Sequence, residues 1–291
     1  MFVAVMLTLV AVGTVVFHFV SPWWWTPIAS NWEYIDDTII ITFWITGAVF
    51  VAIMAFMIYC VYRFRYQEGR RAEYEPENAK LEWWLTIVTS VGVAGMLIPG
   101  LFVWNQFVSV PEGAAEVEVL GAQWQWGFRY PGKDGVMGTS NVRLISDDNP
   151  FGLDPNDPNG RDDILIDGDD LHLPIGGPVK MLLRSIDVLH DFYVPQFRAK
   201  MDMVPGTVTY FWLTPTRSGT FDILCFELCG VGHYTMRGKV VVEEKAAFEA
   251  WLGEQETFAQ TMARAASDPG RAARLALRET SKMAVENRPV Q

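Results

Sequence analysis

Three long stretches without charged side chains crowd the first 110 residues of the chain and dominate what this half can become. They cover residues 2–20, about 38–62 and about 83–108. At about 1.5 Å per residue of helix, each is long enough to cross the hydrocarbon core of a bilayer. We therefore expect three transmembrane helices.

The first stretch has a second interpretation, a cleaved signal peptide. It has no basic region ahead of it, and no small-x-small cleavage site precedes residues 22–25. We expect a retained helix, which adds one span to the helical hairpin formed by the other two.

Positive charge is uneven between the loops. Residues 63–71 contain four arginines, whereas residues 22–37 contain no Lys or Arg. Because Lys and Arg mark the cytoplasmic side, we expect the N-terminus and the loop near 63–82 in the cytoplasm and the chain after residue 108 outside. Four tryptophans would form an aromatic belt at the outer interface: Trp23, Trp24, Trp25 and Trp32.

Beyond residue 110 the pattern changes to short β-prone runs bounded by Gly, Pro or Asp. The runs are 117–121, 180–185, 207–213, 219–224 and 238–243. Their regular spacing indicates a β-sandwich or a Greek-key barrel.

After residue 244 the sequence becomes helix-prone, with a break at 268–270 before a second run at 271–285. The predicted fold class is a membrane-anchored α+β protein with a C-terminal helical extension. We expect four parts: an extra helix with an aromatic segment (1–33), a helical hairpin (34–110), a β domain (111–245) and the extension (246–291).

Residues 225–236 bring Cys225, Cys229, His233 and Met236 within twelve positions. A weak Met ligand beside Cys and His is typical of electron-transfer copper rather than structural zinc. The alternatives are a disulfide between the two cysteines and a zinc site, which would leave Met236 unexplained. A single copper uses one thiolate, so the second thiol favours two coppers bridged by two thiolates.

A second imidazole is needed, and the chain has four histidines. His18 lies in the first apolar stretch, and His172 lies at a predicted strand edge, where a solvated or hydrogen-bonded role is expected. His190 follows a β-prone run and precedes residues 191–195, which we expect to turn the chain. We therefore predict His190 as a ligand on a loop between strands.

Residues 185–190 and 225–236 together resemble the CuA domain of subunit II of the haem-copper cytochrome c oxidases, and the resemblance extends from about 34 to 252. It implies a cupredoxin fold and a binuclear copper centre, CuA. Quinol-oxidase relatives lack the ligands found here. The implied ligands are the thiolates of Cys225 and Cys229, the imidazoles of His190 and His233, the Met236 thioether and the Glu227 backbone carbonyl.

The resemblance also implies a function, that of an electron-accepting subunit in an aa3-type-like oxidase. Electrons would pass from cytochrome c, or a similar donor, through CuA to haem in the catalytic subunit I, coupled to oxygen reduction and proton pumping. Further partners would be other oxidase subunits and membrane lipid, and no nucleic acid is expected. The location would be a bacterial inner (plasma) membrane, with the CuA domain periplasmic. The alternative is a membrane-anchored copper-binding or copper-delivery module.

Three further residues receive roles from the resemblance. Trp124 would be the residue where electrons enter, although Trp124 and Trp126 at i and i+2 can also be two rings on one face of a strand. The Glu227 carboxylate would hold magnesium or manganese shared with subunit I, with a solvated surface Glu as the alternative. Glu82 would lie at the mouth of a proton-uptake path, unless it is an interfacial charge or an anion at a helix N-terminus.

The formal net charge of −11 predicts an acidic outer surface that steers a basic donor. Asp187 and Asp202 match acidic docking positions of the family, whereas Arg129, Gly132 and Lys133 fall where other members carry carboxylates.

Residues 146–170 contain nine Asp and one Arg. This segment is rich in Asp, Asn and Gly, as calcium loops are, but it fails the EF-hand spacing. We expect a solvated insertion. No Cys-x-x-Cys-His motif occurs, so no fused c-type haem is expected.

Overall fold

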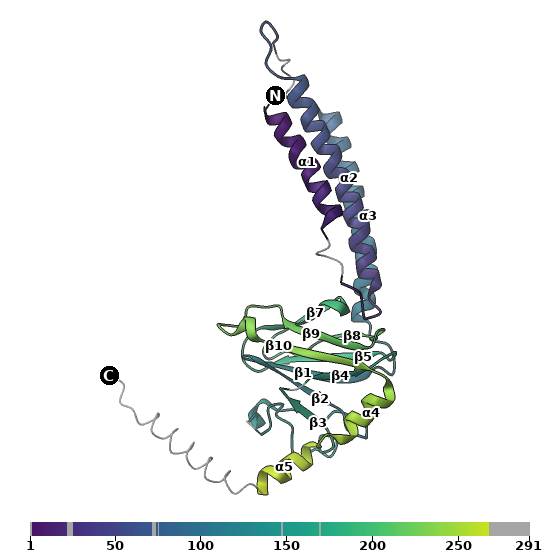
Figure 1. Ribbon diagram of the computed structural model, residues 1–291, viewed down its shortest axis with the longest axis vertical. Helices are drawn as coiled ribbons and strands as arrows, with labels where there is room; N and C mark the ends of the chain where they lie inside the picture. Colours follow the sequence, from purple (N-terminus) through teal and green to yellow (C-terminus); the bar gives the residue numbers. More distant parts are fainter. Residues whose placement is uncertain are drawn as a thin grey trace, which may run out of the picture. The chain divides into compact units, whose positions relative to one another are not determined.

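The computed structural model describes residues 2–21, 26–71, 74, 76–146, 148–168 and 170–267. The chain divides into two compact units, drawn in Figure 1. One is helical and contains residues up to 28 and from 32 to 109. The other is built mainly of strands and contains residues 29–31 and the chain from 110 onward.

The helical unit contains α1 (Phe2–Val20), α2 (Glu33–Arg63) and α3 (Ala79–Val108). All three are long and apolar enough to cross a membrane, with mean hydropathies of 2.4, 2.4 and 1.9. Helix α3 begins before the uncharged stretch because the Asn78 side chain caps it, accepting a hydrogen bond from Leu81 N at 3.1 Å. Helices α1 and α2 pack together through aromatic rings, with 6.1 Å between the ring centroids of Phe19 and Trp44.

The structure corrects the predicted aromatic belt at Trp32. Its side chain is buried and packs against Phe107 of α3, with 5.1 Å between ring centroids. It therefore contributes to the interior rather than to a lipid-facing surface. The other predicted members, Trp23, Trp24 and Trp25, lie outside the described residues.

Two five-stranded sheets form the β unit, in the orders β3-β2-β1-β5-β8 and β4-β10-β9-β6-β7. The first contains β1 (Ala115–Ala122), β2 (Gln125–Tyr130), β3 (Ile164–Asp167), β5 (Val179–Ser185) and β8 (Thr209–Leu213). The second contains β4 (Leu171–Pro174), β6 (His190–Val194), β7 (Ala199–Met203), β9 (Gly219–Cys225) and β10 (Arg237–Glu243). The pairs β1–β5 and β4–β10 are parallel and the others antiparallel.

Aromatic side chains join the two sheets. Phe192 of β6 lies 5.7 Å from Trp126 of β2 and 6.1 Å from Phe211 of β8, measured between ring centroids. All three are fully buried, and burial of rings of this size is a major source of stability in a β-sandwich. The inward faces of the sheets therefore form a continuous core behind the strand ends that carry the site.

The segment between β2 and β3 is not simply a solvated insertion. Phe151 and Leu153 are buried with Leu120 of β1 in one hydrophobic cluster. Asp163 is fully buried, and its carboxylate accepts hydrogen bonds from Arg129 at 3.0 Å and from Gly138 N at 3.0 Å. A buried carboxylate needs such partners to offset its desolvation.

Arg129 is likewise not part of an exposed docking face. Its side chain is almost completely buried and also pairs with Glu118. The positive charge is therefore neutralised inside the β unit rather than presented to a donor.

Two short helices follow the last strand, α4 (Lys245–Glu254) and α5 (Phe258–Ser267). Trp251 of α4 stacks on His172 of the edge strand β4, 3.9 Å between centroids, and His172 bonds to Glu243 at 2.7 Å. Helix α5 buries Phe258 in the cluster with Phe151. The predicted run at 271–285 lies outside the described residues.

Replacing Phe258 by alanine is expected to destabilise the β unit by about 3–5 kcal/mol, because it leaves a cavity in this cluster. Denaturant unfolding of the full chain in detergent, followed by circular dichroism, measures the loss. Glu249→Ala, on the exposed side of α4, is the control. Equal stability of the two variants would show that α5 contributes little to the fold.

The connection between α1 and α2 is anchored in the β unit. The Ser30 hydroxyl donates to the Phe197 carbonyl at 2.7 Å, and Thr214 N donates to the Asn31 side chain at 2.7 Å. Residues Ala29–Asn31 therefore belong with the strands although they separate two apolar helices in the sequence.

Candidate metal centre

Strand ends and one loop bring the predicted ligands together. His190 is the first residue of β6 and Cys225 the last residue of β9, and these strands are hydrogen-bonded neighbours. Cys229 follows in the loop, and His233 lies in a single 3-10 turn (His233–Thr235) before β10. His190 is thus on a strand rather than a loop, and the chain turns at Pro195.

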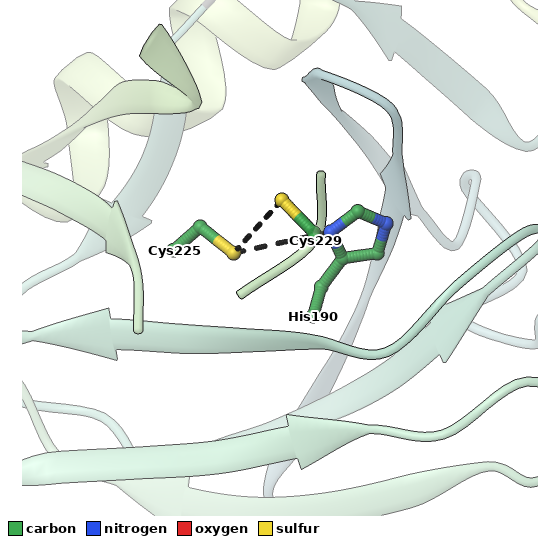
Figure 2. Close-up of side chains that lie close together, drawn as sticks. All are labelled: His190, Cys225 and Cys229. Carbon is green, nitrogen blue, oxygen red and sulfur yellow. Dashed lines mark hydrogen bonds between the residues drawn. The ribbon is translucent and has the colours of Figure 1, made fainter. Parts of the chain in front are cut away.

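The two thiols face each other in the interior of this region, as Figure 2 shows. Their sulfur atoms are 3.7 Å apart and both cysteines are free, so the disulfide alternative is not what the structure contains. His190 Nδ1 lies 3.9 Å from Cys225 Sγ. The three ligand atoms all lie within 4.8 Å of one another, and all three residues are buried.

The other predicted ligands surround the same sulfur pair. His233 Nδ1 is 3.5 Å and Met236 Sδ is 3.8 Å from Cys229 Sγ. The Glu227 carbonyl oxygen is 3.2 Å from Cys225 Sγ. Each sulfur therefore has one imidazole and one weaker donor beside it.

The thiol pair favours a single negative charge when no metal is bound. Burial tends to raise the pKa of Cys225, but hydrogen bonding with His190 and the nearby backbone outweighs it and lowers this pKa to about 6. Burial and the neighbouring Cys225 raise the pKa of Cys229 to about 11. A thiolate that is already buried among donors is well prepared to bind a soft cation.

Asp187 fixes the orientation of the His190 ring. Its Oδ1 lies 2.8 Å from His190 Nε2, and its Oδ2 accepts a hydrogen bond from Gln123 N at 2.6 Å. With Nε2–H donated to the carboxylate, Nδ1 keeps its lone pair toward the sulfurs, as in carboxylate–histidine–metal arrangements. The carboxylate predicted for docking is thus engaged at the centre. Asp202 is half exposed, 3.7 Å from Lys200, and its docking role stays a prediction.

Trp124 and Trp126 do not share a strand face. Trp126 is buried in the core, whereas Trp124 lies in the turn between β1 and β2 and is 37% exposed. The Trp124 indole N–H donates to the Cys229 carbonyl at 3.2 Å. A Cβ at Gly232 would lie 2.3 Å from the indole. The ring therefore packs directly on the backbone of the loop between β9 and β10, residues 226–236, which we call the ligand loop.

Sequence reasoning missed Gln123, whose side-chain Nε2 donates to the same Cys229 carbonyl at 2.8 Å. The only sign of this role in the sequence is that Gln123 directly precedes Trp124. Glu82 lies exposed in the first turn of α3, and the Glu227 side chain is partly buried. The structure leaves the proton-path role of Glu82 and the magnesium or manganese role of Glu227 as predictions.

The donor set fits copper. Two sulfurs, two imidazoles and a thioether are soft or borderline ligands, whereas magnesium and calcium sites use oxygen. Two thiols and two imidazoles alone would suffice for one tetrahedral zinc, but the Met236 thioether and the Glu227 carbonyl beside them raise the set to six donors, more than one such zinc needs.

Comparisons with known proteins agree with this chemistry. Residues 115–244 match the family described as "Cytochrome C oxidase subunit II, periplasmic domain". A protein of Bradyrhizobium diazoefficiens named alternative cytochrome c oxidase subunit 2 is 67% identical over 259 residues, covering 89% of this chain and 94% of the relative. Cytochrome c oxidase subunit 2 of Cereibacter sphaeroides is 29% identical over 238 residues, covering 78% of this chain and 77% of the relative.

Among solved structures, the periplasmic domain of cytochrome oxidase subunit II (CoxB) of Bradyrhizobium japonicum is 24% identical, covering 50% of this chain and 95% of that domain, with a TM-score of 0.37. Apolar helices joined to a β unit with a buried thiol–imidazole cluster define a class of membrane-anchored redox subunits. The chain belongs to the cytochrome c oxidase subunit II family. It is thus a subunit of an oxidoreductase complex, and its family and ligand cluster suggest a copper site.

Proposed function

We propose that this chain is the electron-accepting subunit of an aa3-type-like haem-copper cytochrome c oxidase, with a binuclear CuA centre in a Greek-key cupredoxin domain. The observation that carries the proposal is the pair of free thiols 3.7 Å apart with an imidazole on each side. These two thiols and two imidazoles would hold the copper pair.

The other four predicted ligands divide evenly between the two sulfurs. His190 and the Glu227 carbonyl lie beside Cys225, and His233 and Met236 lie beside Cys229. When bound, the copper pair supplies a one-electron carrier whose charge is shared over two metals and two sulfurs.

The protein contributes a site that is already formed. Cys225, Cys229, His190 and Met236 are at least 92% buried, as their exposures of 8%, 2%, 0% and 1% show. Metal ligands that are buried and held in place need little movement when the charge of the centre changes, which keeps electron transfer fast. The partly exposed Trp124 ring, bonded to the Cys229 carbonyl, gives a donor a path to the thiolates.

The proposed topology has three membrane spans, with the N-terminus and the loop near 63–82 cytoplasmic and the β unit periplasmic in a bacterial inner membrane. The arginines of residues 63–71 support it. The hydrogen bonds of Ala29–Asn31 to the β unit also support it, because they assign the α1–α2 connection to the same side as the strands.

Further parts of the proposal rest on the family resemblance. They are the four-part division of the chain, the passage of electrons to haem in subunit I with oxygen reduction and proton pumping, and contact with lipid. The Glu227 carboxylate would share magnesium or manganese with subunit I, and Glu82 would open a proton path. Cytochrome c or a similar protein would dock near Asp202 and Trp124.

Replacing Trp124 by phenylalanine tests where electrons enter. The variant loses the indole N–H bond to Cys229 and part of the ring contact, so electron transfer from reduced cytochrome c should slow about tenfold. Stopped-flow mixing with the full copper-loaded chain in detergent measures this rate. Copper content should match the wild type, and an unchanged rate at full copper content would remove Trp124 from the path.

A further inference from the structure

Gln123 makes two hydrogen bonds that reach opposite sides of the candidate metal centre. Its backbone N–H donates to Asp187 Oδ2 at 2.6 Å, and its side-chain Nε2 donates to the Cys229 carbonyl at 2.8 Å. The first bond leads to one imidazole, because the other oxygen of Asp187 contacts His190. The second leads to the ligand loop.

The Cys229 carbonyl accepts a second hydrogen bond, from the Trp124 indole at 3.2 Å. A carbonyl oxygen has two lone pairs, so both bonds can form together. The Gln123 bond is the shorter one. It therefore fixes the direction in which this carbonyl presents its second lone pair to Trp124.

Close packing adds to this arrangement at Gly230. A Cβ built there would lie 3.0 Å from Gln123 Nε2 and 3.3 Å from the Trp124 ring. The amide and the indole thus both lie against the backbone immediately after Cys229, where a larger residue would separate them from it.

We propose that Gln123 is a positioning residue that holds the Cys229 peptide in register with the Trp124 indole and so sets the rate at which electrons reach the thiolates. This rests on the proposed function, because the thiolates must hold copper for a rate to exist. Gln123 itself neither binds the metal nor carries the electron. Without the Gln123 side-chain amide, the Cys229 carbonyl accepts only the longer indole hydrogen bond, so its peptide plane is held less firmly.

The loss has a second consequence, on the reduction potential. An N–H dipole pointing at a ligand residue withdraws electron density and favours the reduced state. Removing it should lower the potential of the bound copper. A purely structural role for Gln123 predicts a change in unfolding temperature without a change in potential.

Gln123→Met and Gln123→Asn test the proposal in the full chain, purified in detergent and loaded with copper(II). Methionine keeps the length of the side chain but removes the donor. Asparagine keeps the amide but withdraws it by about one C–C bond, which puts the carbonyl beyond ordinary hydrogen-bond range. Gln125→Met is the matched control, since the Gln125 side chain is exposed and makes no hydrogen bond within the described structure.

Both Gln123 variants should bind as much copper as the wild type, have a lower midpoint potential and accept electrons from reduced cytochrome c about fivefold more slowly, the loss expected for one neutral hydrogen bond. Gln125→Met should match the wild type. The proposal is overturned if either Gln123 variant, at full copper content, keeps the wild-type potential and rate. It is also overturned if both variants lose copper, because Gln123 would then be needed to build the site. A wild-type chain that takes up no electrons would instead contradict the proposed function itself.

Discussion

Replacing Cys229 by serine should reduce bound copper from two to at most one per chain and abolish electron acceptance. Cys229 Sγ is the sulfur closest to both His233 and Met236 and lies 3.7 Å from Cys225 Sγ. A serine hydroxyl is a hard oxygen donor that does not replace a bridging thiolate for copper. Elemental analysis of the purified full chain and stopped-flow reduction measure the two effects.

The chain provides a matched control for this substitution. Cys60 lies in α2, in the helical unit, and is a free thiol like the other two. Cys60→Ser should keep full copper content and wild-type reduction. If Cys229→Ser kept two coppers, the sulfur pair would not be the centre of the site.

Replacing Asp187 by asparagine should weaken copper binding about 10–100-fold, as is usual when the partner of a metal-binding histidine is removed. Asparagine can accept a hydrogen bond at one atom, but its NH₂ group would then face a backbone donor that now bonds to the carboxylate, such as Gln123 N. The His190 ring would lose the negative charge that holds it in position. Competition with a copper chelator measures the affinity.

This prediction separates two roles for Asp187. A residue that only docks the donor would leave copper affinity intact and change the concentration dependence of electron transfer. Asp202→Asn is the control, because Asp202 is half exposed and lies 3.7 Å from Lys200. Equal copper affinity in both variants would return Asp187 to the docking face.

The sequence predicted the elements that have a clear period or an unbroken apolar run. The three apolar helices and the strands β1, β5, β8, β9 and β10 all appear near their expected positions. The predicted β-prone runs do not include the remaining strands, β2, β3, β4, β6 and β7. Of these, β3 and β4 are only four residues long, and β6 begins at a ligand. Short strands like these take their structure from neighbours, which local propensity does not encode.

Charged residues were the least predictable, because their position depends on partners far away in the sequence. Nine Asp in one segment indicated solvent exposure, yet Asp163, just before β3, is buried against Arg129 of β2. Burial of such a pair depends on tertiary contacts.

The ligand types of the candidate site follow from the spacing of residues 225–236, but its supporting residues do not. Asp187 lies in the bend between β5 and β6 and Gln123 in the turn between β1 and β2, and no periodic pattern marks either residue. Two rings at i and i+2 suggested a shared face, but the turn before β2 separates Trp124 from Trp126.

We propose that two coppers share the two thiolates in the β unit. The most direct measurement is the copper-to-protein ratio of the full chain in detergent, together with its paramagnetic resonance spectrum. We expect two coppers per chain with one unpaired electron spread over both. One copper per chain that exchanges freely with a chelator would contradict it and would favour a copper-delivery module.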